Sequence, residues 1–262
     1  MSVGTAFTRA VSPRLADCAL THLERQPIDA ARAAEQHRAY EAALAAAGLE
    51  MIRLPSLPDF PDGVFVEDTA LILGRHAVIT RPGAPSRAGE AESTAAGLAG
   101  RFEVRRLDAG HVDGGDVLRI GRTLYVGLSA RTDRTGFESL ARAAGPLGFE
   151  VVAVPVRACL HLKSAVTFAG TDRAGTPILI HDPAAIASDP FVDVEAVAVP
   201  LEEAAAANML RAGSALIVAA GNPRTADLLD ARGFEVVALD VSELQKAEAG
   251  LTCMSLVAAP GG

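Results

Sequence analysis

The chain has 262 residues, half of them hydrophobic but only 4% aromatic and without Trp, so a core must be built mainly from Ala, Val and Leu. A formal net charge of −8 argues against nucleic acid as a partner and suits a protein that handles cations. The sequence lacks a run of about 18 apolar residues, a signal-peptide core and a CxxC pair, so we expect a cytoplasmic protein in a reducing compartment, with no membrane contact.

One pattern recurs along the chain. An Ala-rich segment predicted to be helical ends at Gly or a polar turn, and a short apolar strand with Glu near its start follows. Gly before the strand is typical of a left-handed helix C-cap, and alternating Val predicts a strand. The copies of this strand occupy residues 48–55, 100–107, 148–155, 194–200 and 233–240.

A second apolar run follows most copies. Strand, loop, strand and helix repeated in this way predict short sheets arranged in a circle around one axis. The alternative is an ordinary α/β protein whose helix–strand pairs resemble one another by chance. The second runs occupy residues 69–73, 117–120, 165–169, 215–219 and 255–259.

A circular repeat has a consequence for the loops that follow the five strands, because equivalent loops emerge at the same end of the ring. We therefore expect one end to gather carboxylates from two loops, a histidine from the third and a thiol from the fifth. These loops are residues 59–68, 108–116, 157–164, 201–208 and 241–253.

The thiol is Cys253, which on its own is most simply a small buried hydrophobic residue. As a nucleophile it needs a neighbour that favours its thiolate. His161 lies between two leucines, so it is either a core residue or a catalyst, and His111 is the competing candidate. Cys159 and His161 also form a potential zinc pair, but no further ligand stands at recognisable spacing, so we predict neither a metal nor a cofactor.

The loop acids and arginines each have two interpretations. The Asp-Gly-Gly-Asp run that starts at Asp113 is either a plain turn or a close backbone approach to a ligand. Glu67 and Asp68 lead directly into an apolar strand, where acids usually have a cationic partner that a substrate can supply. Arg81 and Arg87 bound a rigid loop that is either a surface turn or a fork for a ligand carboxylate.

Together these motifs resemble those of the dimethylarginine dimethylaminohydrolases, members of the guanidino-group-modifying superfamily that also contains arginine deiminase and the amidinotransferases. The resemblance runs in order from residues 12–20 to the C-terminus. It implies a five-bladed α/β-propeller, the pentein fold, of ββαβ-like repeats in a single domain over residues 1–262. The stretches that carry it are FVEDTALI (65–72), ITRPGAPSR (79–87), VDGGDVL (112–118), YVGLSARTDRTG (125–136), LHLKSAV (160–166) and LTCMSLV (251–257).

Carried over position by position, the resemblance implies that Cys253 is the nucleophile and that His161, not His111, is the general acid and base, oriented by Asp113. Glu67 and Asp68 would face the guanidinium, and Asp62 would take the substrate α-amino group. Arg87 and Arg131 would take its α-carboxylate. Backbone groups of Leu20 and Ala247 would complete the pocket. Before the cysteine the family commonly reads Val-Asp-Gly, whereas this chain reads Ala247-Glu248-Ala249.

The implied activity is hydrolysis of dimethylarginine or monomethylarginine to citrulline through a covalent thiouronium on Cys253. A thiolate suits attack on the sp² carbon of a guanidinium that carboxylates hold in place. The small-molecule substrate is the expected partner, with a homodimer as a further possibility. The alternatives are a related hydrolase or deiminase acting on arginine or another substituted guanidine, although deiminases usually carry an inserted helical domain, and a non-catalytic protein that binds arginine derivatives or zinc.

Overall fold

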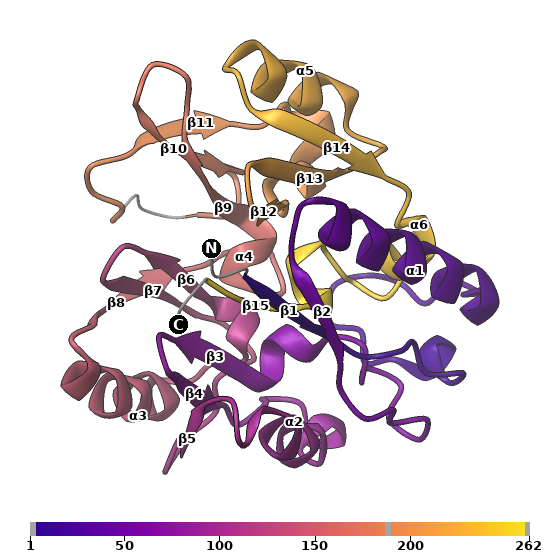
Figure 1. The fold of residues 1–262 in the computed structure, drawn as a ribbon, viewed down its shortest axis with the longest axis vertical. Coiled ribbons are helices and arrows are strands. Elements are labelled where there is room, and N and C mark those ends of the chain that lie inside the picture. The colour runs from indigo at the N-terminus through magenta and orange to yellow at the C-terminus, as the bar shows by residue number, and fades with distance from the viewer. Residues whose placement is uncertain (1–3, 187–189, 260–262) are drawn as a thin grey trace.

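The computed structural model describes residues 4–186 and 190–259. Within these residues the strands form five sheets of three strands each, and the sheets stand around a common axis (Figure 1). This arrangement confirms the circular five-bladed α/β fold expected from the repeats. Among the same residues, no helix has the length and apolar character needed to cross a membrane.

Every sheet orders its strands in the same way. A strand beside the axis runs antiparallel to the middle strand, which runs parallel to the outer strand. From the axis outward, the sheets consist of β15 (Leu256–Ala258), β1 (Thr5–Thr8) and β2 (Glu50–Arg53); β3 (Ala70–Leu73), β4 (His76–Ile79) and β5 (Glu103–Arg106); β6 (Val117–Ile120), β7 (Thr123–Leu128) and β8 (Glu150–Pro155); β9 (Val166–Thr171), β10 (Pro177–His181) and β11 (Glu195–Ala198); and β12 (Leu210–Ala212), β13 (Ala215–Ala219) and β14 (Glu235–Leu239).

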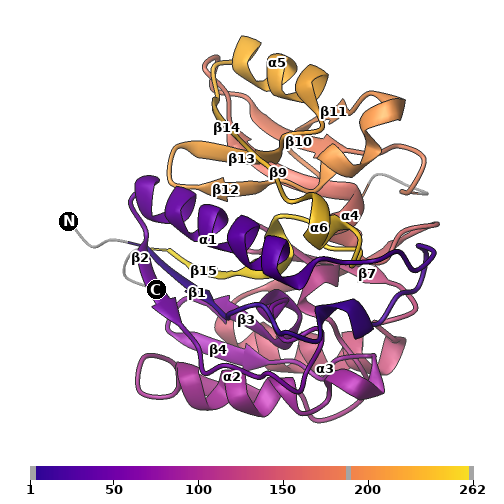
Figure 2. The same ribbon diagram turned by 90° about the vertical axis from the view of Figure 1, so that its right-hand side faces the viewer.

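Helices connect the middle strand to the outer strand in four sheets and cover the outside of the ring (Figures 1 and 2). They are α1 (Ala30–Ala46), α2 (Glu90–Leu98), α3 (Arg134–Ala144) and α5 (Pro223–Ala231). The side chain of Asp29 caps α1 by accepting from the N–H groups of Ala31 and Arg32. Two short helices, α4 (Leu162–Ala165) and α6 (Ser242–Gln245), lie in the loops that precede β9 and β15.

The predicted strand pattern agrees with the outer strands. Each begins at Glu, and in four of the five sheets the preceding Gly has the left-handed backbone expected of a C-cap, with φ between 80° and 88°. One equivalence was wrong: residues 215–219 form the middle strand β13, not the strand beside the axis. That place belongs to β12, which the sequence pattern missed because it has only three residues and contains the exposed Arg211.

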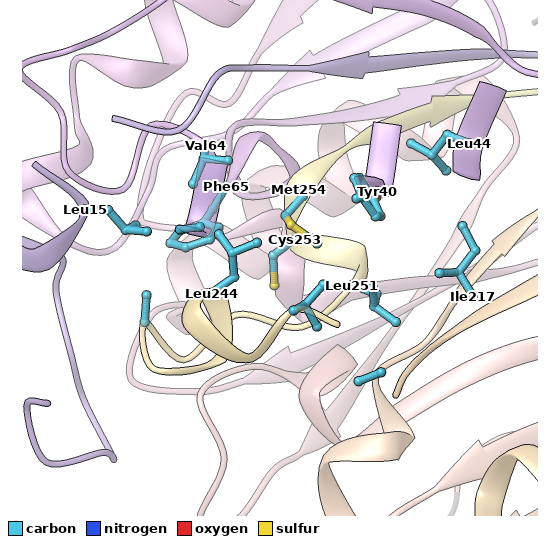
Figure 3. Packing of buried hydrophobic residues seen from close by; sticks show 14 of the residues in the cluster. Leu15, Tyr40, Leu44, Val64, Phe65, Ile217, Leu244, Leu251, Cys253 and Met254 are labelled. Atoms are coloured by element: carbon cyan, nitrogen blue, oxygen red, sulfur yellow. The ribbon is translucent and has the colours of Figure 1, made fainter. Parts of the chain in front are cut away.

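The two ends of the chain close the ring. β15 pairs antiparallel with β1, so that Phe7 lies opposite Leu256, and β1 pairs in turn with β2. Against this sheet, Tyr40 and Leu44 of α1 pack with Cys253 and Met254 in one buried cluster (Figure 3). The hydroxyl groups of Tyr40 and Ser255 lie 2.7 Å apart in the same region. The segment from Cys253 to Ser255 is therefore held by packing against α1 and by the pairing of β15 with β1.

Equivalent turns precede the strands beside the axis and contact one another. The turn Val66–Thr69 contacts both Gly114–Asp116 and Thr252–Met254, while α4 contacts Gly114–Asp116 and the turn Leu201–Ala207. These contacts confirm that the loops of the five units meet at one end of the ring. Because the turns come from segments far apart in the sequence, the ring brings together residues that no local structure could join.

Candidate active site

The central pair of the site is His161 and Asp113. His161 directly precedes α4, Asp113 directly precedes the turn Gly114–Asp116, and Nε2 of the histidine lies 3.0 Å from Oδ2 of the aspartate. Asp113 is fixed because its Oδ1 accepts from the N–H of Gly83 at 2.7 Å. His111, the competing candidate, lies at the surface, where it pairs with Asp133.

Two glycines allow Asp68 and His161 to approach the Asp113 turn. A Cβ at Gly115 would lie 2.6 Å from Nδ1 of His161 and 2.8 Å from Oδ1 of Asp68, and a Cβ at Gly114 would lie 2.0 Å from the carbonyl oxygen of Glu67. The N–H of Gly115 donates to Oδ1 of Asp68 at 2.9 Å. The run is therefore a buried turn that packs closely against Glu67, Asp68 and His161. Its close approach to a ligand stays a prediction.

Charge is balanced between His161 and the acids around it. Burial by itself lowers the pKa of His161, but the charge of Asp68 and the hydrogen bond with Asp113 outweigh it and raise that pKa to about 9. Burial raises the pKa of Asp68, yet the positive charges of His161 and Arg87 prevail and lower it to about 2. At neutral pH the site thus holds a buried imidazolium beside a carboxylate, which gives it an acid that is ready to donate a proton.

Cys253 lies in the turn Thr252–Met254, almost fully buried. Its Sγ accepts from the N–H of Gly250 at 3.3 Å. Burial, followed by the negative charges of Glu67 and Asp68, raises the pKa of the thiol to about 12. The thiol is therefore protonated at neutral pH, and a cation bound beside it would favour the thiolate.

A small cavity of about 20 Å³ joins these groups to the residues expected at the amino-acid end of a substrate. Asp62 accepts from the N–H of Ala19 at 3.2 Å, and burial raises its pKa. Arg131 donates to Oγ1 of Thr21 at 2.9 Å. Leu20, between these contacts, is half-buried. The residues around the cavity include Cys253, His161, Asp68, Asp62, Arg131 and Ala247.

Arg87 also borders this cavity, but its guanidinium is held by groups of the protein. Nε and Nη2 donate to Oε2 of Glu90 at 3.1 and 2.8 Å, Nη2 donates to the carbonyl oxygen of Phe65 at 2.8 Å, and Nη1 donates to Asp68. Arg87 therefore fixes the position of the Asp68 carboxylate through its own guanidinium. Its expected contact with a substrate carboxylate stays a prediction.

Adjacent acids at positions 67 and 68 point in different directions. Glu67 contacts the ammonium group of Lys163 and accepts from Oγ1 of Thr252 at 2.7 Å. Together with Lys163 it borders a separate cavity of about 220 Å³ between the strands beside the axis, whereas Asp68 borders the cavity of Cys253. Asp68 thus lies at the cavity of Cys253, and Glu67 joins three loops. The expected contact of both acids with a guanidinium stays a prediction.

Comparisons with known proteins agree with this geometry. The family model described as arginine deiminase matches residues 31–175. A Streptomyces coelicolor protein named N(G),N(G)-dimethylarginine dimethylaminohydrolase is 42% identical over 96% of this chain and 95% of its own length. The Pseudomonas aeruginosa protein of the same name is 36% identical over 87% of this chain and 89% of its own length.

This chain belongs to the dimethylarginine dimethylaminohydrolase family. A crystal structure of the Pseudomonas aeruginosa dimethylarginine dimethylaminohydrolase, a cysteine-to-serine mutant complexed with citrulline, superposes with a TM-score of 0.90 over 98% of this chain and all of the other, at 33% identity. The N-terminal domain of a cyanobacterial arginine dihydrolase shares the fold with a TM-score of 0.83 at 20% identity, covering 98% of both chains.

One residue of this dimethylarginine dimethylaminohydrolase family member escaped the sequence analysis although it supports Cys253. Oδ1 of Asn208 accepts from the N–H of Thr252 at 3.1 Å, and its Nδ2 donates to Oγ1 of Thr252 at 3.2 Å. A Cβ at Gly250 would lie 2.1 Å from Cγ of Asn208, so the two loops fit closely. Its position at the end of the fourth loop, where the other loops carry their functional residues, was the signal that could have found it.

Potential metal ligands also occur at the site. Within the described residues, one group of three, Asp68, Asp113 and His161, has ligand atoms within 4.8 Å of one another. Cys159, which the sequence paired with His161 as potential ligands, is not in this group, and its thiol donates to the carbonyl oxygen of His161 at 3.3 Å.

Proposed function

We propose that this protein hydrolyses dimethylarginine and monomethylarginine to citrulline, releasing dimethylamine or methylamine. The observation that carries the proposal is the joint placement of Cys253, the His161–Asp113 pair and Asp68 around one buried cavity. It is supported by relatives of more than one third identity that carry the name of this activity, and by the citrulline bound to one of them.

Recognition would use both ends of the substrate. Asp68, whose carboxylate is held at the cavity by Arg87 and Gly115, would accept from the guanidinium N–H groups. The adjacent Glu67 would face the same group. At the other end, Asp62 would take the α-ammonium group and Arg131, with Arg87, the α-carboxylate. The backbone of Leu20 and Ala247 would complete this pocket. A substrate with both charged ends is thereby oriented with its guanidinium carbon in front of the thiol.

The first half of the reaction forms a covalent adduct. The bound cation lowers the pKa of Cys253, and the thiol releases its proton to solvent because His161 is already protonated. The thiolate then attacks the guanidinium carbon. His161, protonated at neutral pH, gives its proton to the substituted nitrogen as the carbon–nitrogen bond breaks. Dimethylamine leaves, and a thiouronium remains on sulfur.

In the second half, neutral His161 takes a proton from water as the water oxygen attacks the thiouronium carbon. The adduct then loses its hydroxyl proton to solvent as the carbon–sulfur bond breaks, which releases citrulline and restores the thiolate. Asp113 holds the imidazole in orientation and stabilises its protonated form through both steps.

Citrulline formation from dimethylarginine, monomethylarginine and arginine, measured in parallel with and without a chelator, tests the proposal. We expect turnover of the two methylated substrates, and we expect Cys253→Ser to abolish it while still binding dimethylarginine. Turnover of arginine alone would indicate a deiminase, and binding without turnover of any of the three would indicate a non-catalytic binding protein.

We further propose that residues 1–262 form one catalytic domain in the cytoplasm. The closure of the first sheet by β15, from the far end of the chain, supports a single unit. A homodimer stays a prediction that the measured mass in solution would test.

A further inference from the structure

Residues 19–23 border the candidate active site from outside the ring of loops. Ala19 lines the small cavity that contains Cys253, and His22 and Leu23 line a neighbouring cavity of about 360 Å³. Leu20 is partly buried against the core cluster that contains Cys253, whereas residues 21–23 are exposed, with Leu23 half exposed. Residues 21–23 are therefore held mainly by polar contacts.

One carboxylate makes most of these contacts. Glu248 accepts from the N–H of Thr21 at 2.9 and 3.0 Å, and also from the N–H groups of His22 and Leu23. Successive backbone N–H groups that converge in this way form an anion-binding concavity. Hydrogen bonds to a charged acceptor are also stronger than those between neutral groups.

The backbone of Glu248 is itself unusual. Its φ is +60°, in the left-handed region that residues other than glycine seldom adopt. Such a conformation persists where surrounding contacts over-determine it, and here the residue lies between Ala247 and Gly250 in the loop that leads to Cys253. The Cys253 loop thus presents Glu248 to the segment across the cavity.

The same segment occupies the two groups proposed for the ends of a substrate. The N–H of Ala19 donates to Asp62 as an α-ammonium group would, and the hydroxyl of Thr21 accepts from Arg131 as an α-carboxylate would. The cavity that remains, about 20 Å³, has room for little more than one water molecule. An amino acid therefore cannot enter while the segment is in this position.

We infer that Glu248 is a positioning residue that holds residues 21–23 in the closed position, and that a substrate enters by displacing the Ala19 and Thr21 contacts. The inference rests on the proposed function for the roles of Asp62 and Arg131. The Glu248 contacts lie outside the small group of atoms that a substrate replaces, so they re-form over a bound ligand. Glu248 would then slow both entry and release while changing the affinity little.

Amide hydrogen exchange of the ligand-free protein tests the clamp without any substrate. In Glu248→Gln, which keeps the size and removes the charge, exchange at residues 21–23 should become about 10- to 100-fold faster. Glu248→Asp keeps the charge but has a shorter side chain, so its exchange rate at residues 21–23 should lie between those of the unmodified protein and of Glu248→Gln. Glu24→Gln, at an exposed acid of the same segment, is the matched control and should leave the exchange unchanged.

Alkylation of Cys253 by iodoacetamide, followed by mass spectrometry to distinguish it from Cys18 and Cys159, should accelerate in the same order. For citrulline, NMR line shapes should give association and dissociation rates that both rise about tenfold in Glu248→Gln, with Kd within about threefold, because the clamp acts equally on the free and bound states. If Glu248→Gln instead distorted the pocket, binding would weaken and Kd would rise.

Exchange at residues 21–23 that stays unchanged in both Glu248 variants would overturn the inference, as would a weakened Kd with an unchanged dissociation rate. If the unmodified protein neither binds citrulline nor turns over dimethylarginine, the proposed function fails, whereas the exchange experiment still decides the role of Glu248.

Discussion

Nε2 of His161 lies 3.0 Å from Oδ2 of Asp113, although the two residues belong to different units of the ring. A histidine in an apolar stretch becomes a catalytic candidate through this contact, because the aspartate supports the protonated imidazole. The neighbouring Asp68 adds a second negative charge at 4.0 Å from Nδ1.

Replacing Asp113 by Asn should lower kcat for dimethylarginine by about 10²- to 10⁴-fold, because the imidazole loses the charge that orients and stabilises its protonated form. The pKa of His161 should fall from about 9, so the alkaline limb of the pH–rate profile should move to lower pH. His111→Ala, at the exposed competing histidine, is the control and should stay within about twofold. An Asp113→Asn variant with normal kcat and an unshifted profile would contradict the assigned pairing.

Stability should depend on the proton of His161. Its pKa is about 9 in the folded protein against an ordinary 6.5, so the folded state binds the proton more tightly. The resulting stabilisation is complete below about pH 6.5 and is lost as the pH rises through about 9; a pKa difference of this size corresponds to about 3 kcal/mol.

Urea unfolding at pH 6 and pH 9.5 would measure this loss. Other groups also titrate between these pH values, so the change in the free energy of unfolding is also measured for His161→Gln, whose side chain cannot be protonated in this range. The unmodified protein should lose up to about 3 kcal/mol more than the variant between the two pH values. Equal losses in the two proteins would argue against a raised pKa of His161.

A guanidinium ligand should ionise Cys253. The pKa of about 12 arises from burial and from the negative charges of Glu67 and Asp68, and a bound cation opposes both causes. The ultraviolet absorbance of the thiolate at neutral pH should therefore rise when methylguanidinium is added. Subtracting the signal of Cys253→Ser removes the contributions of Cys18 and Cys159, and a difference of zero would count against substrate-assisted ionisation.

Gly115→Ala should reduce activity by at least about 10²-fold, because the added methyl group would lie 2.6 Å from Nδ1 of His161 and 2.8 Å from Oδ1 of Asp68. Overpacking of this kind also costs about 1–3 kcal/mol of stability, measurable by urea unfolding. Gly145→Ala is the matched control, since nothing lies within 4 Å of its added methyl group and its backbone is helical. Equal activity in both variants would show that the approach at Gly115 is unimportant.

Much of the fold was predictable because its information is local and repeated. Each unit carries the same helix, glycine and Glu-led strand, so the periodicity predicts the five sheets and the common end at which their loops meet. The one wrong equivalence, at residues 215–219, arose because β12 is a three-residue strand with the exposed Arg211 at its centre and therefore shows no apolar run. β15 is equally short but apolar throughout, and the sequence pattern included it. β12 is recognised only through its pairing with β13.

The sequence by itself identified the thiol, the neighbouring acids and two candidate histidines, since these residue types stand in equivalent loops. Only the tertiary structure placed Asp68 at the cavity and directed Glu67 to Thr252, 185 positions away in the chain. It likewise joined Glu248 to Thr21 across 227 positions. The direction of a side chain on an irregular turn depends on partners from other loops, and those partners come within reach only when the five sheets assemble around the common axis.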